Sequence, residues 1–316
     1  MSRIWLYGRM IIAITAIFAI LYGLVVLIAY LMGFYGSYAF ITLAILAFVI
    51  VFLQYWLSPK IVEVTMRVKY ISKEEMPWLH EIIEKLAIEA GIPKPKIGIA
   101  NVHIPNAFAF GRSKKDGRVC VTKGLLKILN KEEIEAVLGH EISHIKHRDM
   151  VVITMLSVIP LISYLIFWNS LWSRDRRNGA IAGIAFLVYL LTNMLVLYVN
   201  RLREYYADYG SARLTKRPHL LASALYRITL ATYGLPIEEI KKVEGMKAFF
   251  ATDPSKARRD LMELKKADLN MNGHLDEYEV KMFAEHAKPS KFDKIMEIFS
   301  SHPNIIDRIK KLAEVE

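Results

Sequence analysis

Two long stretches of the chain are apolar and carry no charged residue outside one short loop, and they alternate with two polar segments. The first runs from Met10 to Pro59, and "GFYGS" at 33–37 is a natural turn in its middle. The second covers 150–200 and is divided by the charged loop "RDRR" at 174–177. Because one membrane span needs about 20 apolar residues, each stretch is long enough for two spans. The pattern therefore predicts four transmembrane helices in two hairpins, at 10–31, 38–57, 150–170 and 180–199.

Buried core helices or a signal peptide would account for the apolar stretches less well than membrane spans do. Core helices of a soluble protein normally keep a polar stripe, and long uncharged runs lack one. A further alternative is two spans with a semi-buried pair. A cleaved signal peptide is not expected, because the first run is too long, lacks a small-residue cleavage pattern and is followed directly by a second apolar run.

The charge is strongly positive, with a formal net value of +11. The excess lies in the polar segments 60–149 and 201–316. Lysine and arginine favour the cytoplasmic side of a membrane, so both polar segments are expected to face the cytoplasm. The arginines of the 174–177 loop would then lie on the opposite side, against this trend. Nucleic-acid binding is not expected, because no basic stripe with interleaved aromatic residues occurs, and attraction to anionic lipid accounts for the charge more simply.

The polar segments show short helical and strand-like patterns. A capping box at Ser72 and Glu75 predicts the start of a helix that Gly91 ends. Asn130 is a plausible N-cap of a second helix. Three short segments between these helices are predicted strands: Lys96–Asn101, Asn106–Phe110 and Val119–Thr122. The fold class expected is mainly α with a small β-sheet.

The second helix contains the sequence H-E-x-x-H. His140 and His144 are four residues apart, so they share one helix face. Zinc binds imidazole nitrogens readily, and a catalytic zinc site keeps one position open for water. Glu141 would lie beside that position and could accept a proton from the water.

A site with two histidines needs a third ligand. The candidates are His147, Asp149, Glu204 and Asp208. His147 is rotated off the face of the histidine pair. Glu204 and Asp208 are four residues apart, so one can bind the metal while the other orients a ligand histidine. Because the second apolar hairpin joins the two segments, we expect Glu204 to be the third ligand.

Five motifs give the chain a resemblance to a known family. In order and spacing they resemble the HtpX-type membrane zinc metalloproteases, which are relatives of the CAAX prenyl endopeptidases. The motifs are "NAFAFG" at 106–111, "VTKGLL" at 121–126, "HEISHIKHRD" at 140–149, "REYYAD" at 203–208 and "SSHPNIIDRI" at 300–309.

The resemblance implies a gluzincin-like protease domain with specific roles for its residues. It implies zinc ligands at His140, His144 and Glu204, and a general base at Glu141. Asp208 would hydrogen-bond a ligand histidine, and we expect Asp149 to support the ligands in the same way.

The same resemblance implies a substrate strand and an oxyanion donor. Asn106 and Ala107 would lie on an edge strand that holds an extended peptide by its backbone, as in β-augmentation. His302 is a candidate for stabilising the oxyanion, and Tyr205 and Tyr206 are alternatives. Arg308 matches the last motif of the family.

The segment "DLNMNGHLDEYE" at 268–279 resembles an EF-hand loop, with Gly273 at the sharp turn. EF-hands normally occur in pairs, and no second loop is present in the sequence. The alternative is an Asx-rich turn between two helices. The possible calcium ligands are Asp268, Asn270, Asn272, His274, Asp276 and Glu279.

These observations predict a multi-pass zinc endopeptidase of the cell membrane whose site faces the cytoplasm. We expect its substrates to be membrane or misfolded proteins, which would place it in membrane protein quality control and the stress response. The alternatives are a CAAX-type prenyl peptide endopeptidase, a non-catalytic scaffold with structural zinc, and a transporter. A transporter is disfavoured because the spans carry no charged residue. The oligomeric state is left open.

The expected domains follow the alternation of apolar and polar segments. They are an N-terminal transmembrane hairpin (1–59), a first part of the protease domain (60–149), a second hairpin (150–200) and a second part of the protease domain (201–316). Cys120 is the only cysteine, which excludes an intramolecular disulfide and a cysteine zinc cluster.

Overall fold

The computed structural model describes residues 55–149, 176–236, 263–287 and 297–315, with single positions between 49 and 53 and between 152 and 167. The predicted span at 10–31 lies outside the described residues, as do most positions of the spans at 38–57 and 150–170. The chain divides into two compact units. One unit comprises Met1–Ser58 and Val151–Leu202, and the other comprises Pro59–Met150 and Arg203–Glu316.

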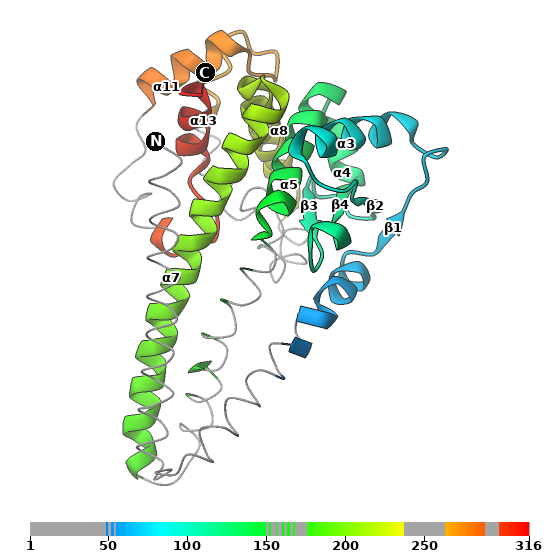
Figure 1. The fold of residues 1–316 in the computed structure, drawn as a ribbon. Helices are drawn as coiled ribbons and strands as arrows, with labels where there is room; N and C mark the ends of the chain where they lie inside the picture. Colours follow the sequence, from blue (N-terminus) through cyan, green and yellow to red (C-terminus); the bar gives the residue numbers. More distant parts are fainter. Residues whose placement is uncertain are drawn as a thin grey trace. The chain divides into compact units, whose positions relative to one another are not determined.

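The first unit contains most of a long helix, α7, which spans Arg176–Thr215 (Figure 1). Within it, Ala182–Thr215 is the one helix among the described residues that is long and apolar enough to cross a membrane. Val196 and Val199 of α7 pack with Leu156 in a small apolar cluster of this unit. The predicted span at 180–199 is therefore helical and apolar, whereas the arrangement of four spans stays a prediction.

The second unit contains a four-stranded mixed sheet in the order β1-β2-β4-β3. The β2–β4 pair is parallel, and the β1–β2 and β3–β4 pairs are antiparallel. The three predicted strands are present, with β3 beginning one residue later than expected. β1 was not predicted, because its sequence, "VKY", is too short to show alternation. The strands are β1 Val68–Tyr70, β2 Lys96–Ala100, β3 Ala107–Phe110 and β4 Arg118–Thr122.

The helix α3 spans Pro77–Ala90, so the predicted start at Ser72 is wrong. The backbone N–H of Ser72 does donate to Glu75 Oε2 at 2.8 Å, but this contact closes a turn before the helix. Pro77 sets the start instead, because its fixed φ suits the first helical position and it has no N–H to satisfy. The predicted end at Gly91 is confirmed, with a left-handed φ of 67°.

The helix with the H-E-x-x-H sequence is α5, Lys131–His147. Asn130 is its N-cap as predicted, and it forms a capping box with Glu133. Arg148, the C-cap residue that follows the helix, has a left-handed φ of 57°. The remaining elements of this unit are η1 Lys114–Asp116, α4 Lys123–Ile128, α8 Pro218–Tyr233, α11 Glu277–His286 and α13 Ile305–Ala313.

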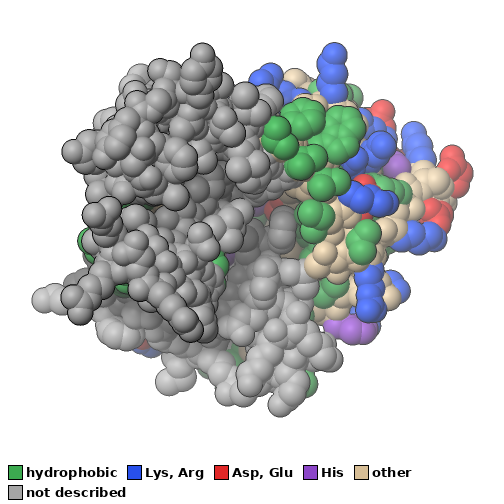
Figure 2. All heavy atoms as spheres, turned by 90° about the horizontal axis from the view of Figure 1, so that it is seen from below, with side chains coloured by type: hydrophobic (Ala, Val, Ile, Leu, Met, Phe, Trp, Pro, Cys, Tyr) green, Lys and Arg blue, Asp and Glu red, His purple; other side chains and the backbone are tan. Residues whose placement is uncertain are grey.

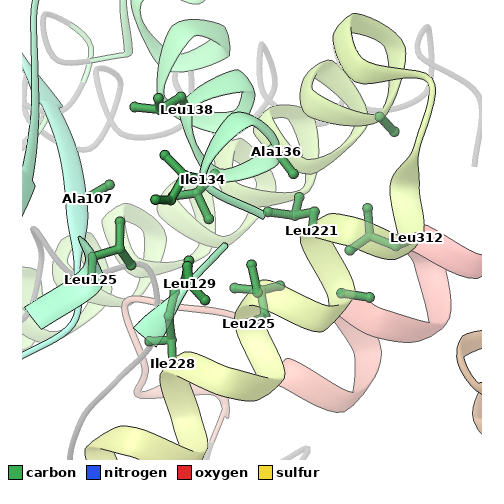
Figure 3. Close-up of a cluster of buried hydrophobic side chains, with 14 of the residues drawn as sticks. Ala107, Leu125, Leu129, Ile134, Ala136, Leu138, Leu221, Leu225, Ile228 and Leu312 are labelled. Carbon is green, nitrogen blue, oxygen red and sulfur yellow. The ribbon is translucent and has the colours of Figure 1, made fainter. Parts of the chain in front are cut away.

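The core of the second unit surrounds α5, which packs against α3, α8 and β3. Figure 3 shows Ile134 and Leu138 of α5 in the same buried cluster as Leu221 and Leu225 of α8. The cluster also takes in Leu312, because α13 packs against α8. These apolar contacts hold the zinc-motif helix in a fixed position relative to α8 and α13.

A buried ion network also joins α5 to its neighbours. Glu133 is fully buried and accepts hydrogen bonds from Ser223 Oγ and Arg227 Nη1, both at 2.7 Å. His274 Nδ1 lies 3.0 Å from the same carboxylate. Buried charges are retained when they are paired in this way. The network ties the start of α5 to α8 and to the 268–279 loop.

A second apolar cluster of this unit covers another part of the sheet. A helix through residues 55–65 contributes Val62, which packs with the neighbouring Met66, the β3 residues Phe108 and Phe110, and Cys120.

On the face seen in Figure 2, the described residues carry many lysine and arginine side chains set among hydrophobic ones. This distribution agrees with the excess positive charge of the polar segments.

Candidate metal centre

The two histidines of α5 and one glutamate of α7 converge at one point in the second unit. His140 Nε2 and His144 Nε2 lie 3.1 Å apart. Glu204 Oε2 lies 3.6 Å from His140 Nε2, and Glu204 Oε1 lies 3.6 Å from His144 Nε2. Among the described residues, these three form the one group of histidine, cysteine or acidic residues with ligand atoms all within 4.8 Å of one another.

Small residues allow α5 and α7 to approach closely enough for this convergence. A Cβ atom built on Gly210 of α7 would lie only 2.0 Å from Ser143 Oγ and 2.6 Å from Ser143 Cβ. One residue further, Ser211 Oγ donates to the backbone carbonyl of Ala136 at 2.6 Å. Close helix crossings need small side chains at the contact. The crossing places Glu204, less than two turns before Gly210, opposite the histidine pair.

We predict that Gly210→Ala separates the two helices and weakens the metal centre. The added methyl group would overpack the crossing, which typically destabilises a protein by about 1–3 kcal/mol. Zinc affinity, measured by chelator competition, and the free energy of unfolding should both fall. Ser143→Gly removes the clashing side chain, so the double variant should regain the affinity of Ser143→Gly alone. No recovery in the double variant would contradict this account of the crossing.

Each histidine has an aspartate behind it. His140 Nδ1 lies 2.9 Å from Asp208 Oδ1, and His144 Nδ1 lies 2.7 Å from Asp149 Oδ2. A carboxylate at Nδ1 favours the tautomer with its hydrogen there, which leaves the Nε2 lone pair for a metal. Both aspartates are buried, so the ring orientations are held away from solvent.

Each aspartate is in turn held by an arginine. Arg308 of α13 donates to Asp208 through Nε at 2.8 Å and Nη2 at 2.6 Å. Arg203 Nε lies 3.2 Å from Asp149 Oδ1. Neither arginine was assigned a role from the sequence. The available signal is that Arg308 lies on the apolar face of its helix, where a charge needs a buried partner.

The charges of the centre suit a divalent cation. Four carboxylates and two guanidinium groups leave two negative charges when both histidines are neutral. Zinc–ligand distances of about 2.0–2.1 Å place tetrahedral ligand atoms roughly 3.3–3.4 Å apart, close to the spacing here. The residues present therefore fit zinc in both donor type and charge. The charged groups are Glu141, Asp149, Arg203, Glu204, Asp208 and Arg308.

The carboxylates also favour positive charge at His140. Burial alone would lower its pKa, but hydrogen bonding to Asp208 and Glu204 and their negative charges outweigh burial and raise the pKa to about 10. A site that attracts protons so strongly attracts a metal cation for the same electrostatic reason.

Glu141 lies next to His140 on α5 and is only 4% exposed. Burial raises the pKa of its carboxyl group, with the charges of His140 and His144 acting in the opposite direction. The backbone N–H of Ala109 donates to this carboxylate. A carboxyl group whose pKa is nearer neutral can accept a proton and return it more readily.

The strand β3, at the end of the sheet, lies against α5. The N–H of Thr122 donates to the carbonyl of Asn106 at 2.9 Å. Because antiparallel pairs alternate, the backbone groups of Ala107 and Ala109 then point away from β4. The hydrogen bond from Ala109 to Glu141 fits this direction. Asn106 and Ala107 are both buried, and Ala109 is partly exposed.

The three candidates for stabilising the oxyanion have different neighbours. His302 is buried, and its Nδ1 lies 3.7 Å from Glu204 Oε2. The centre of the Tyr205 ring lies 3.1 Å from Lys311 Nζ. The ring of Tyr206 lies 6.0 Å from that of His147. His302 thus lies beside Glu204, a residue of the metal group.

Two alternative third ligands do not face the Nε2 atoms. His147 Nδ1 lies 2.8 Å from the carbonyl of Ser143, on its own helix. Asp149 lies at Nδ1 of His144, on the side opposite Nε2. Glu204 is the candidate whose two oxygens face both Nε2 atoms.

The structure does not support calcium binding at the 268–279 loop. Asp268 accepts hydrogen bonds from the backbone N–H groups of Asn272 and Gly273, at 3.1 and 2.9 Å. Glu279 accepts from Leu269, Asn270 and Asp276. Its carboxylate therefore serves the loop backbone, and the carboxylates of the loop form no metal group among the described residues. The Asx-rich turn, which was the alternative, describes these contacts. The other polar contacts of the loop lie within it or reach Glu133 of α5 and three residues of α8. They involve Asn270, Asn272, His274 and Asp276 within the loop and at Glu133, and Asp268, Leu275 and His274 toward Tyr226, Ser223 and Arg227.

Comparisons with known proteins show the family to which the chain belongs. The family profile described as peptidase family M48 matches residues 73–316. The HtpX protease homologue of Methanothermobacter thermautotrophicus is 50% identical over 222 residues, which cover 70% of this chain and 85% of that protein. The homologue of Pyrococcus furiosus is 40% identical over 230 residues, covering 70% and 79%. HtpX homologue 2 of Methanosarcina mazei is 32% identical over 298 residues, covering 91% and 90%.

One solved structure is a distant match. The crystal structure of S. mikatae Ste24p covers 98% of this chain and 67% of its own, with a TM-score of 0.48 and 17% sequence identity. That likeness is too weak to carry an argument about fold or function. The family profile and the curated relatives are sufficient, and the chain therefore belongs to peptidase family M48, as a membrane metalloprotease of the HtpX type.

Proposed function

We propose that this protein is a zinc endopeptidase that cleaves unfolded or membrane proteins at the cytoplasmic face of the cell membrane. The observation that carries the proposal is the convergence of His140, His144 and Glu204 within 4.8 Å, with Glu141 on the same helix as the histidines. The nearby strand β3 offers backbone groups to a peptide. Such an enzyme would act in membrane protein quality control.

His140, His144 and Glu204 would hold the zinc ion. Asp208 and Asp149 keep the two imidazole rings oriented toward it, because their carboxylate oxygens lie 2.9 and 2.7 Å from the Nδ1 atoms of His140 and His144. Zinc bound there supplies a Lewis acid that polarises the scissile carbonyl and makes a water molecule acidic enough to lose its proton near neutral pH.

Glu141 performs the proton transfers of the reaction. It accepts a proton from the water whose oxygen attacks the carbonyl carbon. It then returns that proton to the amide nitrogen as the C–N bond breaks, which gives an amine and a carboxylic acid that loses its remaining proton to solvent. His302, which lies beside Glu204, is the proposed donor to the carbonyl oxygen as negative charge develops there.

The substrate would bind as an extended strand along β3. The N–H and C=O of Ala107 and the C=O of Ala109 point away from β4, so they can pair with a peptide main chain. Binding through the main chain depends little on side chains, which suits unfolded segments of varied sequence. Glu204 follows the apolar span at 180–199 closely in the sequence, which supports substrates at the membrane surface.

The substrate class can be tested by offering two substrates to the purified enzyme in detergent. We expect casein, as an unfolded protein, to be cleaved in a zinc-dependent manner, and a prenylated C-terminal peptide to be left intact. Cleavage of the prenylated peptide alone would replace the proposed substrate class. Bound zinc with turnover of neither substrate would instead favour a structural role for the metal.

A further inference from the structure

Arg308 reaches the metal centre from α13, one hundred positions along the chain from Asp208. The arginine is 1% exposed and belongs to the largest fully buried side chains. Its Nε and Nη2 donate to the two carboxylate oxygens of Asp208 at 2.8 and 2.6 Å. Its third nitrogen, Nη1, lies 3.5 Å from Glu204 Oε2.

These contacts join Arg308 to two residues of the metal group. Asp208 Oδ1 accepts from Arg308 and also lies 2.9 Å from His140 Nδ1. The guanidinium group therefore fixes the aspartate that orients His140. It also places positive charge against one oxygen of Glu204. Burying an unpaired charge is costly, so the arginine and its carboxylates hold one another in place.

We propose that Arg308 is a positioning residue for the metal, which orients His140 through Asp208 and restrains Glu204 directly. This inference rests on the ligands assigned under the proposed function. It makes α13, near the end of the chain, a part of the metal centre.

The geometry requires arginine rather than any positive charge. A guanidinium group presents parallel N–H donors that match both oxygens of a carboxylate, whereas an ammonium group is a single compact charge. Lysine at this position would keep the charge but could not bind Asp208 with two parallel bonds while reaching Glu204. Arg308→Lys should therefore retain only part of the effect, and Arg308→Gln should lose it.

Zinc affinity is the measurement that separates this role from simple structural support. The full chain, purified in detergent with Glu141→Gln to prevent self-digestion, would be titrated with Zn²⁺ against a chelator. Loss of a residue that supports metal ligands typically lowers metal affinity by about 10–100-fold. We expect that loss for Arg308→Gln, and an intermediate loss for Arg308→Lys.

Arg227 supplies a matched control. Its Nη1 donates at 2.7 Å to Glu133, a fully buried carboxylate at the other end of α5. Arg227→Gln and Arg227→Lys should lower the thermal stability of the zinc-free protein but leave zinc affinity unchanged. Equal losses of zinc affinity in the two arginine series would assign both effects to general destabilisation and overturn the proposal.

A double variant tests the route through Asp208. If Arg308 acts mainly by holding Asp208, the combined loss in Asp208→Asn with Arg308→Gln should be smaller than the product of the two single losses. Losses that multiply would contradict that route.

Two outcomes separate the failure of this inference from that of the proposed function. If Arg308→Gln binds zinc as tightly as its parent, the inference about Arg308 is wrong but the proposed function is not affected. A parent protein that binds no zinc overturns the ligand assignment itself. If Arg308→Gln does not fold, the lysine variants test the inference. It requires the zinc affinity of Arg308→Lys to fall several-fold while that of Arg227→Lys is unchanged.

Discussion

Glu141→Gln is expected to keep its zinc and lose hydrolysis, with kcat lowered on the order of 10²–10⁴-fold. The amide has nearly the shape of the carboxylate, so the neighbouring ligand His140 should not move. It cannot accept a proton from the attacking water, so the step that Glu141 performs is lost. Digestion of casein, measured beside zinc content, checks both expectations.

The matched control for this variant is Glu132→Gln, on the same helix. Glu132 is 64% exposed and pairs with Arg217 near the surface. Its replacement should leave both zinc content and digestion unchanged. Casein digestion that survives in Glu141→Gln would rule out the proposed base.

Glu204→Ala is expected to abolish digestion and to remove the stabilising effect of zinc. A ligand that binds only the folded protein stabilises it by mass action, so wild type should melt at a higher temperature when zinc is added. The variant keeps the two histidines but lacks the charged ligand. It should therefore bind zinc too weakly for added zinc to raise its melting temperature. Thermal unfolding with and without added zinc measures the difference.

The control for Glu204→Ala is Tyr209→Ala, a change to an exposed residue of the same helix. It should keep both the zinc-dependent rise in melting temperature and the digestion of casein. Equal behaviour of the two variants would mean that α7 is sensitive to any substitution and that Glu204 is not special.

Features with local signals could be predicted from the sequence. The start of α5 follows from Asn130 as an N-cap residue, and the two histidines share a face because of their helical spacing. Three of the four strands of the sheet follow from short apolar runs bounded by turn residues. The start of α3 was predicted too early, because Ser72 and Glu75 form the expected contact in a turn that does not begin a helix.

Contacts between distant parts of the chain could not be predicted. Arg308 and Asp208 pair across one hundred positions, and neither local sequence specifies the other. The need for glycine at 210 becomes clear only from the structure, in which Ser143 packs directly against this position. In the 268–279 loop the pattern of residues matches a calcium site. Its conformation instead turns Glu279 toward backbone N–H groups, a choice that the spacing of residues cannot show.

The central claim is that Glu204 completes a zinc site with His140 and His144. The most direct measurement is the zinc content of the purified protein by mass spectrometry, for wild type beside Glu204→Ala. The account predicts about one zinc ion per chain in wild type and close to none in the variant. Zinc retained in full by Glu204→Ala would contradict the account, and His147 or Asp149 would become the next candidates for the third ligand.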